Sequence, residues 1–150
     1  MLPQRLTLIT LGVADVKASR AFYERLGFSA AAFESDQVAF FDTTNGAALA
    51  LFGHEALAED ANVPHEGGGF RAVSCAINLE SEAAVDDALA FAEECGGRIT
   101  QPARQVFWGG YSGYFADPDG HLWEVAYNPV FTVDAAGRVR LPAPAAREGA

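Results

Sequence analysis

Residues 114–124 read YFADPDGHLWE, and this stretch decides the fold. The apolar residues before Asp117 predict a strand over 110–116, and those after Gly120 predict a strand over 121–127. Asp117-Pro118-Asp119-Gly120 joins them with proline second and glycine fourth, as in a type I turn closed by a left-handed glycine. The stretch therefore predicts two strands joined by a tight turn.

The residues upstream extend these two strands into a larger unit. Apolar residues predict a strand over 70–79, and Ser81 is a suitable N-cap for a helix with an apolar stripe. Gly96-Gly97 ends that helix, and a short strand is predicted over 98–100. Residues 70–128 therefore predict the order strand, helix, strand, strand, strand.

The first 53 residues spell the same order. A strand is predicted over 6–13, followed by a helix that begins at an N-cap at Asp15 and ends at Gly27. Three short apolar runs then predict strands over 28–33, 37–41 and 47–52. A turn at Asn45-Gly46 joins the last two of these strands. The chain therefore reads as an internal duplication of one unit.

We expect a single domain made of four segments. These are a first module at 5–53, a connecting loop at 54–69, a second module at 70–128 and a C-terminal extension at 129–150. The connecting loop is polar and acidic, with one short helix expected within it, and the extension is expected to form a small hairpin before a Pro/Ala-rich tail. The expected helix covers 55–60, and the hairpin pairs 131–133 with 138–141.

Length and charge exclude several classes of protein. At 150 residues and 50% hydrophobic side chains, the chain suits one folded domain rather than disorder. The 20 acidic and 10 basic side chains give a net charge of -10, which argues against nucleic acid and anionic membranes as partners. Cys75 and Cys95 form no disulfide framework. With no signal peptide and no apolar run of about 18 residues, we expect a cytoplasmic protein without a membrane span.

At this point the residues resemble a known family, the vicinal oxygen chelate superfamily of glyoxalase I, fosfomycin- and bleomycin-resistance proteins and extradiol dioxygenases. The resemblance rests on YFADPDGHLWE and on first-module residues: Val13-Ala14-Asp15, Ser19, Phe22-Tyr23 and Leu26-Gly27-Phe28. It covers about residues 5–128. It implies an α+β fold in which two βαβββ modules form curled mixed sheets around a cavity. By analogy with relatives of this length, we also expect a homodimer.

The metal enzymes of this family take ligands from four positions. When the resemblance is used to place these positions in this chain, only one of them holds a residue that is a strong metal ligand. The first-module positions fall on Leu8 and near Ala50, which have no donor, and the second-module positions fall near Ser74 and on Glu124. A divalent ion here needs about three protein ligands, so Glu124 is the only matching ligand. We therefore predict no metal site and no cofactor, with a divalent ion at Glu124 as the alternative.

The histidines offer no replacement ligands. His54 follows the last strand of the first module, His65 lies in the connecting loop and His121 begins the last strand of the second module. None shares a face with another, so we interpret them as surface or turn residues. No Ser-His-Asp spacing, phosphate-binding loop or dinucleotide fingerprint favours another enzyme class.

Strand parity indicates which side chains accompany Glu124 in the cavity. Because residues two apart point the same way, Leu122 and Ala126 share its side, and their neighbours face the helix layer: Trp123, Val125 and Tyr127. Glu124 is the predicted catalytic residue or ligand partner. The alternative is that Glu124 has only a structural role, as a carboxylate that accepts a hydrogen bond from Ser74 or Tyr114.

Five further residues are predicted to bind the ligand. Tyr114 matches a tyrosine that relatives send into the cavity, Ser112 shares its face, and Ser74 lines the strand opposite. Phe107 and Trp108 precede a glycine pair that leaves room beside their rings, and their alternative role is packing in the core. Aromatic rings with one carboxylate and a few hydroxyls suit a small, partly apolar ligand.

Three functions remain open. The first is a metal-independent protein that binds a small molecule, in which Glu124 pairs with a cationic ligand and an aromatic ring stacks on it. The second is a glyoxalase-like lyase or isomerase, or a dioxygenase relative, that uses Glu124 with or without a metal. If apolar groups wall Glu124, burial would favour its protonated form and suit it to general base chemistry. The third is an accessory module whose cavity is closed.

Overall fold

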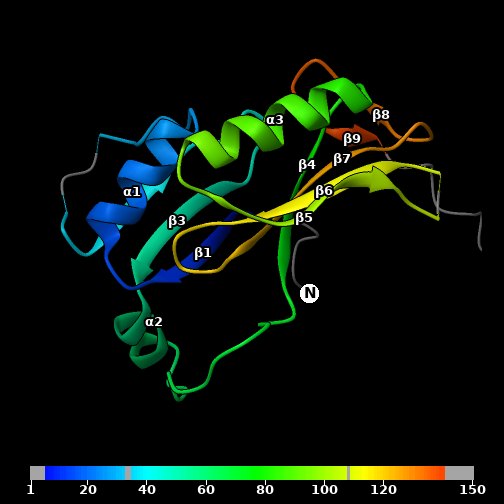
Figure 1. Cartoon of the computed structure of the whole chain (residues 1–150). Helices are drawn as coiled ribbons and strands as arrows, with labels where there is room; N and C mark the ends of the chain where they lie inside the picture. The colour runs from blue at the N-terminus through cyan, green and yellow to red at the C-terminus, as the bar shows by residue number, and fades with distance from the viewer. Residues whose placement is uncertain (1–5, 33–34, 108, 141–150) are drawn as a thin grey trace, which may run out of the picture.

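Two open mixed sheets carry the fold, with the two longer helices packed on them and a short helix at the end of the three-stranded sheet (Figure 1). The computed structural model describes residues 6–32, 35–107 and 109–140. One sheet has three strands and the other has four, and the element order repeats strand, helix and strands in each half. This α+β arrangement of two modules confirms the predicted fold class.

The first module forms the three-stranded sheet, in the order β1-β3-β2. β1 (Leu8–Val13) pairs in parallel with β3 (Ala48–Gly53), and β2 (Val38–Phe41) pairs antiparallel with β3. α1 (Val16–Arg25) connects β1 to the later strands and packs against β2 and β3. A parallel pair needs such a crossover, because a tight turn can join only antiparallel strands.

The second module repeats this plan with four strands, in the order β4-β7-β6-β5. β4 (Ser74–Asn78) pairs in parallel with β7 (Leu122–Tyr127), which pairs antiparallel with β6 (Tyr111–Ala116). β5 (Arg98–Gln105) pairs antiparallel with β6 at the edge. α3 (Glu82–Glu94) packs against β5, β6 and β7, so it covers one face of this sheet.

The remaining elements lie outside the two modules. α2 (His54–Asp60) follows β3 and contacts β1 and β3, where a short helix was predicted. β8 (Thr132–Val133) and β9 (Val139–Arg140) pair antiparallel and confirm the predicted C-terminal hairpin. In the described part of the chain, no helix has the length and apolar character to cross a membrane.

Both predicted helix N-caps are confirmed. The Asp15 carboxylate accepts a hydrogen bond from the backbone N–H of Ala18 at 2.9 Å. The Ser81 hydroxyl accepts one from the N–H of Ala84 at 3.1 Å. Each cap satisfies a helix N–H that has no partner within the helix, which fixes where α1 and α3 begin.

The strand predicted over 28–33 is wrong. In its described part it forms a single bridge, between Ala30 and Phe41 of β2, with one further hydrogen bond from the Ala31 N–H to the Phe40 carbonyl at 2.7 Å. Residues 30–32 are alanines, whose small side chains add little packing to a sheet. The end of the predicted run, from residue 33, lies outside the described residues.

Two strands of the second module have different bounds from those predicted. β4 begins at Ser74 rather than at residue 70. β5 continues to Gln105 instead of ending at residue 100, although it contains Pro102. A proline is tolerated there because β5 is an edge strand with irregular register between Ile99 and Arg104.

A buried hydrogen-bonded chain joins the two modules. Tyr23 of α1 donates from its hydroxyl to the Asp117 carboxylate at 2.7 Å. Trp123 of β7 donates from its indole nitrogen to the Tyr23 hydroxyl at 3.1 Å. All three side chains are buried, and burial together with the charge of Asp117 raises the pKa of the Tyr23 phenol far above its ordinary value. The chain satisfies polar groups that would otherwise be costly to bury.

The turn between β6 and β7 is held against the first module at two further points. Asp117 also accepts the backbone N–H groups of Asp119 and His121 at 2.9 and 2.8 Å, which shapes the turn. Asp119 accepts the N–H of Ala14 at 2.8 Å, and His121 Nε2 lies 2.7 Å from the Gly12 carbonyl oxygen. Since a carbonyl oxygen only accepts, the His121 ring is the donor. His121 is thus a turn residue that also fastens the modules together.

We predict that Tyr23→Phe destabilises the protein by about 1–3 kcal/mol, because it leaves buried atoms of Asp117 and Trp123 without a partner. Urea unfolding measures this loss. Tyr111→Phe is the matched control, because Tyr111 donates to Asp86 in an exposed pair at 2.8 Å. The control should leave the unfolding midpoint nearly unchanged, and equal losses in the two variants would contradict a special role for the buried chain.

The raised pKa of Tyr23 predicts a loss of stability in alkali. Above about pH 10 the unfolded tyrosine releases its proton while the folded Tyr23 keeps it, so the folded state binds more protons. The free energy of unfolding should then fall by up to about 1.4 kcal/mol per pH unit, a contribution fully present below pH 10. Tyr23→Phe should show a shallower alkaline slope in urea unfolding. Identical slopes in the two proteins would refute the assignment.

Candidate functional site

The site lies on the face of the four-stranded sheet that α3 does not cover, which we call the open face. Trp123 and Val125 of β7 are buried on the helix side, as predicted from strand parity. Glu124 therefore points to the open face, where it is half-buried. No helix in the described part of the chain packs on this face of β6 and β7.

Strand pairing brings two predicted site residues together. Tyr114 of β6 lies directly opposite Glu124 of β7, and Ser112 lies opposite Ala126 two positions along. Side chains directly opposite in an antiparallel pair have Cβ atoms about 5 Å apart, so Tyr114 and Glu124 form a contact pair. Ser112 is 4% exposed at the base of the same face.

A cavity of about 390 Å³ opens beside this pair, and we call it the Glu124 cavity. Four of the predicted site residues line it: Ser112, Tyr114, Glu124 and Phe107. Trp108 lies outside the described residues. Ser74 does not line this cavity, because it is paired with Leu122, and Ala76 stands opposite Glu124 instead.

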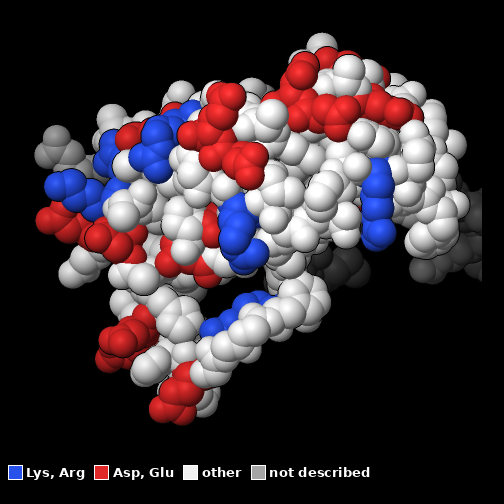
Figure 2. Space-filling view, in the orientation of Figure 1, with Lys and Arg blue, Asp and Glu red and all other residues white. Residues whose placement is uncertain are grey.

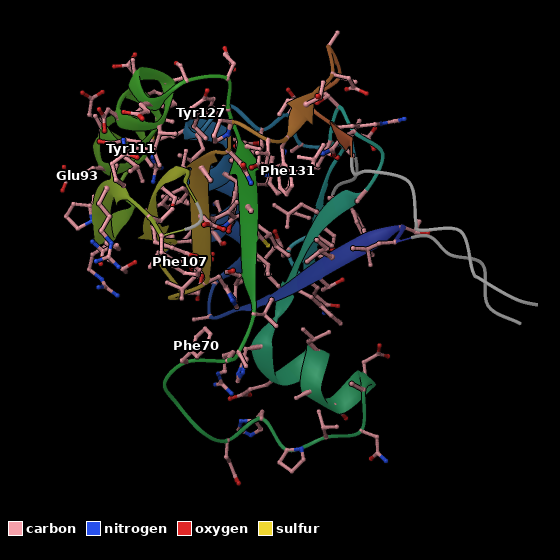
Figure 3. The ribbon with its side chains drawn as sticks, turned by 90° about the vertical axis from the view of Figure 1, so that its right-hand side faces the viewer. Phe70, Glu93, Phe107, Tyr111, Tyr127 and Phe131 are labelled. Carbon is pink, nitrogen blue, oxygen red and sulfur yellow. The ribbon has the colours of Figure 1, made fainter. Side chains whose placement is uncertain are left out.

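Phe107 is fully exposed, which excludes its alternative role in the core. It lies on the turn between β5 and β6, where Figure 3 shows it away from the α3 side that Tyr111 occupies. The turn is closed by a hydrogen bond from the Val106 N–H to the Gly110 carbonyl at 2.9 Å. An exposed aromatic ring at the mouth of a cavity is available for contact with a ligand.

Sequence reasoning missed the wall of the cavity that β5 provides. Gln101, Arg104 and Gln105 line it, and they follow the point where the strand was predicted to end. Gly113 is the sequence feature that could have predicted this wall, since a glycine inside a strand often marks a close approach of another backbone segment. A Cβ atom there would lie 2.8 Å from the backbone nitrogen of Ala103.

The cavity has a polar wall, so the condition of a wholly apolar wall around Glu124 is not met. Arg104, Gln101 and Gln105 face it together with the Ser112 hydroxyl. The Tyr114 phenol has a raised pKa, chiefly because of partial burial, with further contributions from the charge of Glu124 and a hydrogen bond to it. Tyr114 therefore keeps its proton at neutral pH and can donate a hydrogen bond.

The donors do not fit a divalent metal ion. The positions that resemblance assigned to ligands hold Leu8 in β1 and Ala50 in β3, neither of which has a donor atom. Among the described residues, no group of three or more His, Cys, Asp or Glu side chains is placed to hold a metal. Among these described residues, Glu124 therefore belongs to no group of ligands of the kind that a structural or catalytic metal needs.

Comparison of the chain with models of known protein families identifies one family. Residues 5–125 match the profile of the Glyoxalase/Bleomycin resistance protein/Dioxygenase superfamily. No curated protein matches the chain. The match covers both modules, including the turn at 117–120.

Three solved structures illustrate the likeness. A glyoxalase-related enzyme from Fulvimarina pelagi is 35% identical, with 94% of this chain and 100% of that chain covered and a TM-score of 0.84. A glyoxalase/bleomycin resistance protein/dioxygenase from Nocardioides is 27% identical, with 85% of each chain covered and a TM-score of 0.72. Lactoylglutathione lyase from Agrobacterium tumefaciens is 24% identical over 85% of this chain and 96% of that chain. Its TM-score is 0.65, and at this identity the likeness concerns the fold alone.

Removing the charge of Glu124 should lower the pKa of the Tyr114 phenol. In Glu124→Gln the repulsion between tyrosinate and carboxylate is lost, while partial burial of the ring keeps the pKa above 10.0. Titration of tyrosine followed by NMR measures the change. Asp86→Asn is the control, because Asp86 acts on Tyr111. An unchanged pKa of Tyr114 in Glu124→Gln would show that the two groups do not interact.

Proposed function

Since the chain belongs to the Glyoxalase/Bleomycin resistance protein/Dioxygenase superfamily, we propose that it binds a small, partly apolar organic molecule in the Glu124 cavity without a metal ion. The observation that carries this proposal is the Tyr114–Glu124 pair at the wall of a 390 Å³ cavity on the open face. A cavity of this size suits a small organic ligand, and its few convergent polar groups would orient that ligand.

The residues of the cavity indicate what it recognises. The rings of Tyr114 and Phe107 offer apolar surface, and Phe107 is free to close on a ligand because it packs on no core residue. Glu124 would accept a hydrogen bond from an ammonium, amine or hydroxyl group. Arg104 and Gln101 line the other wall, where they can donate to a carbonyl or hydroxyl oxygen.

A second function, a metal-independent lyase or isomerase, is favoured by the 35% identical glyoxalase-related enzyme that this chain matches over nearly its whole length. In such a reaction, Glu124 would take a proton from a carbon next to a carbonyl group. The electron pair would move onto the carbonyl oxygen, which the protonated Tyr114 phenol would stabilise by donating a hydrogen bond. If that carbon carries a hydroxyl group, return of the proton to the former carbonyl carbon, with transfer of the hydroxyl proton to the former carbonyl oxygen, would complete an isomerisation.

We predict that a thermal-shift screen of small aromatic amines and alcohols finds compounds that raise the unfolding temperature. Glu124→Gln should weaken the binding of an aromatic amine found in this way by about tenfold, since a charge-assisted hydrogen bond is lost. Isothermal titration calorimetry measures the affinity, and metal analysis of the same protein should find no stoichiometric divalent ion.

Glu93→Gln is the matched control, because it makes the same change on α3, on the other side of the sheet (Figure 3). Equal losses in the two variants would point to a general effect of charge and contradict a site at Glu124. One tightly held divalent ion per chain would overturn the metal-free proposal. Proton NMR of the bound compound separates the two functions, because a binding protein leaves it unchanged and an isomerase converts it.

A further inference from the structure

A second and larger cavity, of about 640 Å³, lies at the junction of the two modules. Its walls come from α2, from the loop at 61–73 and from the start of β4, with the turn between β6 and β7 at its back. Figure 2 shows the molecule hollowed between this loop and the body above it, with basic side chains at the edge of the hollow. Because two arginines line it, we call it the Arg71–Arg98 cavity.

Among the described residues, neither arginine of this cavity has an acidic partner. Arg98, at the start of β5, is exposed and lies opposite Ala116 on the open face. Arg71 donates to the Gly67 carbonyl at 2.8 Å, which orients its guanidinium within the loop. In the described part of the chain, neither arginine lies within ion-pair distance of a carboxylate. Two unpaired guanidinium groups in one cavity are suited to an anion.

The other polar groups of the cavity compensate this positive charge only in part. Asp119 is the single carboxylate among the described lining residues, and one of its oxygens already accepts the N–H of Ala14 at 2.8 Å. Burial, with the charge of Asp117, raises the pKa of the Cys75 thiol, which therefore stays neutral. A cationic cavity stands out on a chain of net charge -10, whose overall field repels anions.

The rim of the cavity is apolar. Phe70 is 73% exposed and Val73 is 63% exposed, although both are large hydrophobic side chains. Between them Ala72 has a φ of +60°, a left-handed conformation that an alanine rarely adopts. Such strain persists only where the surrounding structure holds it, and here it sets Arg71 and the two apolar side chains on one short segment.

We propose that the Arg71–Arg98 cavity is a second ligand site, which takes an organic anion with a carboxylate group on an apolar body. The carboxylate lies against Arg71 and Arg98, and the apolar body packs on Phe70 and Val73. This site is separate from the Glu124 cavity, whose lining contains neither arginine. The two proposals can therefore fail independently.

The test uses 4-phenylbutanoate as the probe and 4-phenylbutanamide as its uncharged counterpart, added to the full chain. In ¹H–¹⁵N spectra, the carboxylate should shift the backbone amides of Gly68, Gly69, Arg71 and Ser74, all from the lining of this cavity. Arg98→Gln and Arg71→Gln should each weaken its binding about tenfold, as should replacement of the probe by the amide. Added salt should weaken the binding of the carboxylate.

Arg104→Gln is the matched control, because it removes an exposed arginine from the Glu124 cavity. It should change the affinity for 4-phenylbutanoate by less than about twofold. The proposal is overturned if all three arginine variants weaken binding equally, if the shifts map to Gln101–Gln105 instead, or if no binding occurs at millimolar concentration. Because both cavity arginines are on the surface, loss of folding is not expected, and unchanged unfolding curves verify this.

Discussion

The buried carboxylate of Asp117 is the interaction on which the rest of the structure depends. It receives two backbone N–H groups of its own turn and the hydroxyl of Tyr23 from the other module. A buried carboxylate is tolerable only when its oxygens are satisfied, so the turn between β6 and β7 and helix α1 are held in one relative position. That position brings the two modules together, and it also closes the hairpin whose register sets Tyr114 opposite Glu124.

The same strand then serves the core and the site. In β7, Trp123 packs under the helices among Tyr23, Phe28 and Phe115, while Glu124 points to the open face. Because side chains alternate along a strand, an aromatic core on one face leaves the other face for polar residues. The core thereby fixes the orientation of Glu124 without contacting it, and the Glu124 cavity needs no loop to position its carboxylate.

Much of the fold and part of the site could be predicted from the local spacing of residues. Particular residues show which features could not be predicted in this way. Asp15, Ser81 and the turn at 117–120 each act within a few residues, so their roles are readable in the chain. β5 continues beyond Pro102 because it lies at the edge of its sheet, and the strand order that puts it there cannot be read from local spacing. Because the strand was predicted to end at residue 100, Gln101 and Arg104 were not predicted as residues of the cavity. Ser74 was placed beside Glu124, but the parallel register with β7 sets Ala76 there instead.

The chain's periodicity and turn residues already determine two modules of strand, helix and strands and the face of β7 that carries Glu124, because alternation and capping act over short distances. The tertiary structure alone decides which cavities exist. The Glu124 cavity needs β5 folded onto β6 at Gly113, and the Arg71–Arg98 cavity needs residues 27 positions apart to meet across the loop and the sheet. The first of these contacts has a local sign in the chain at Gly113, whereas the second depends on how the modules pack and has no local sign.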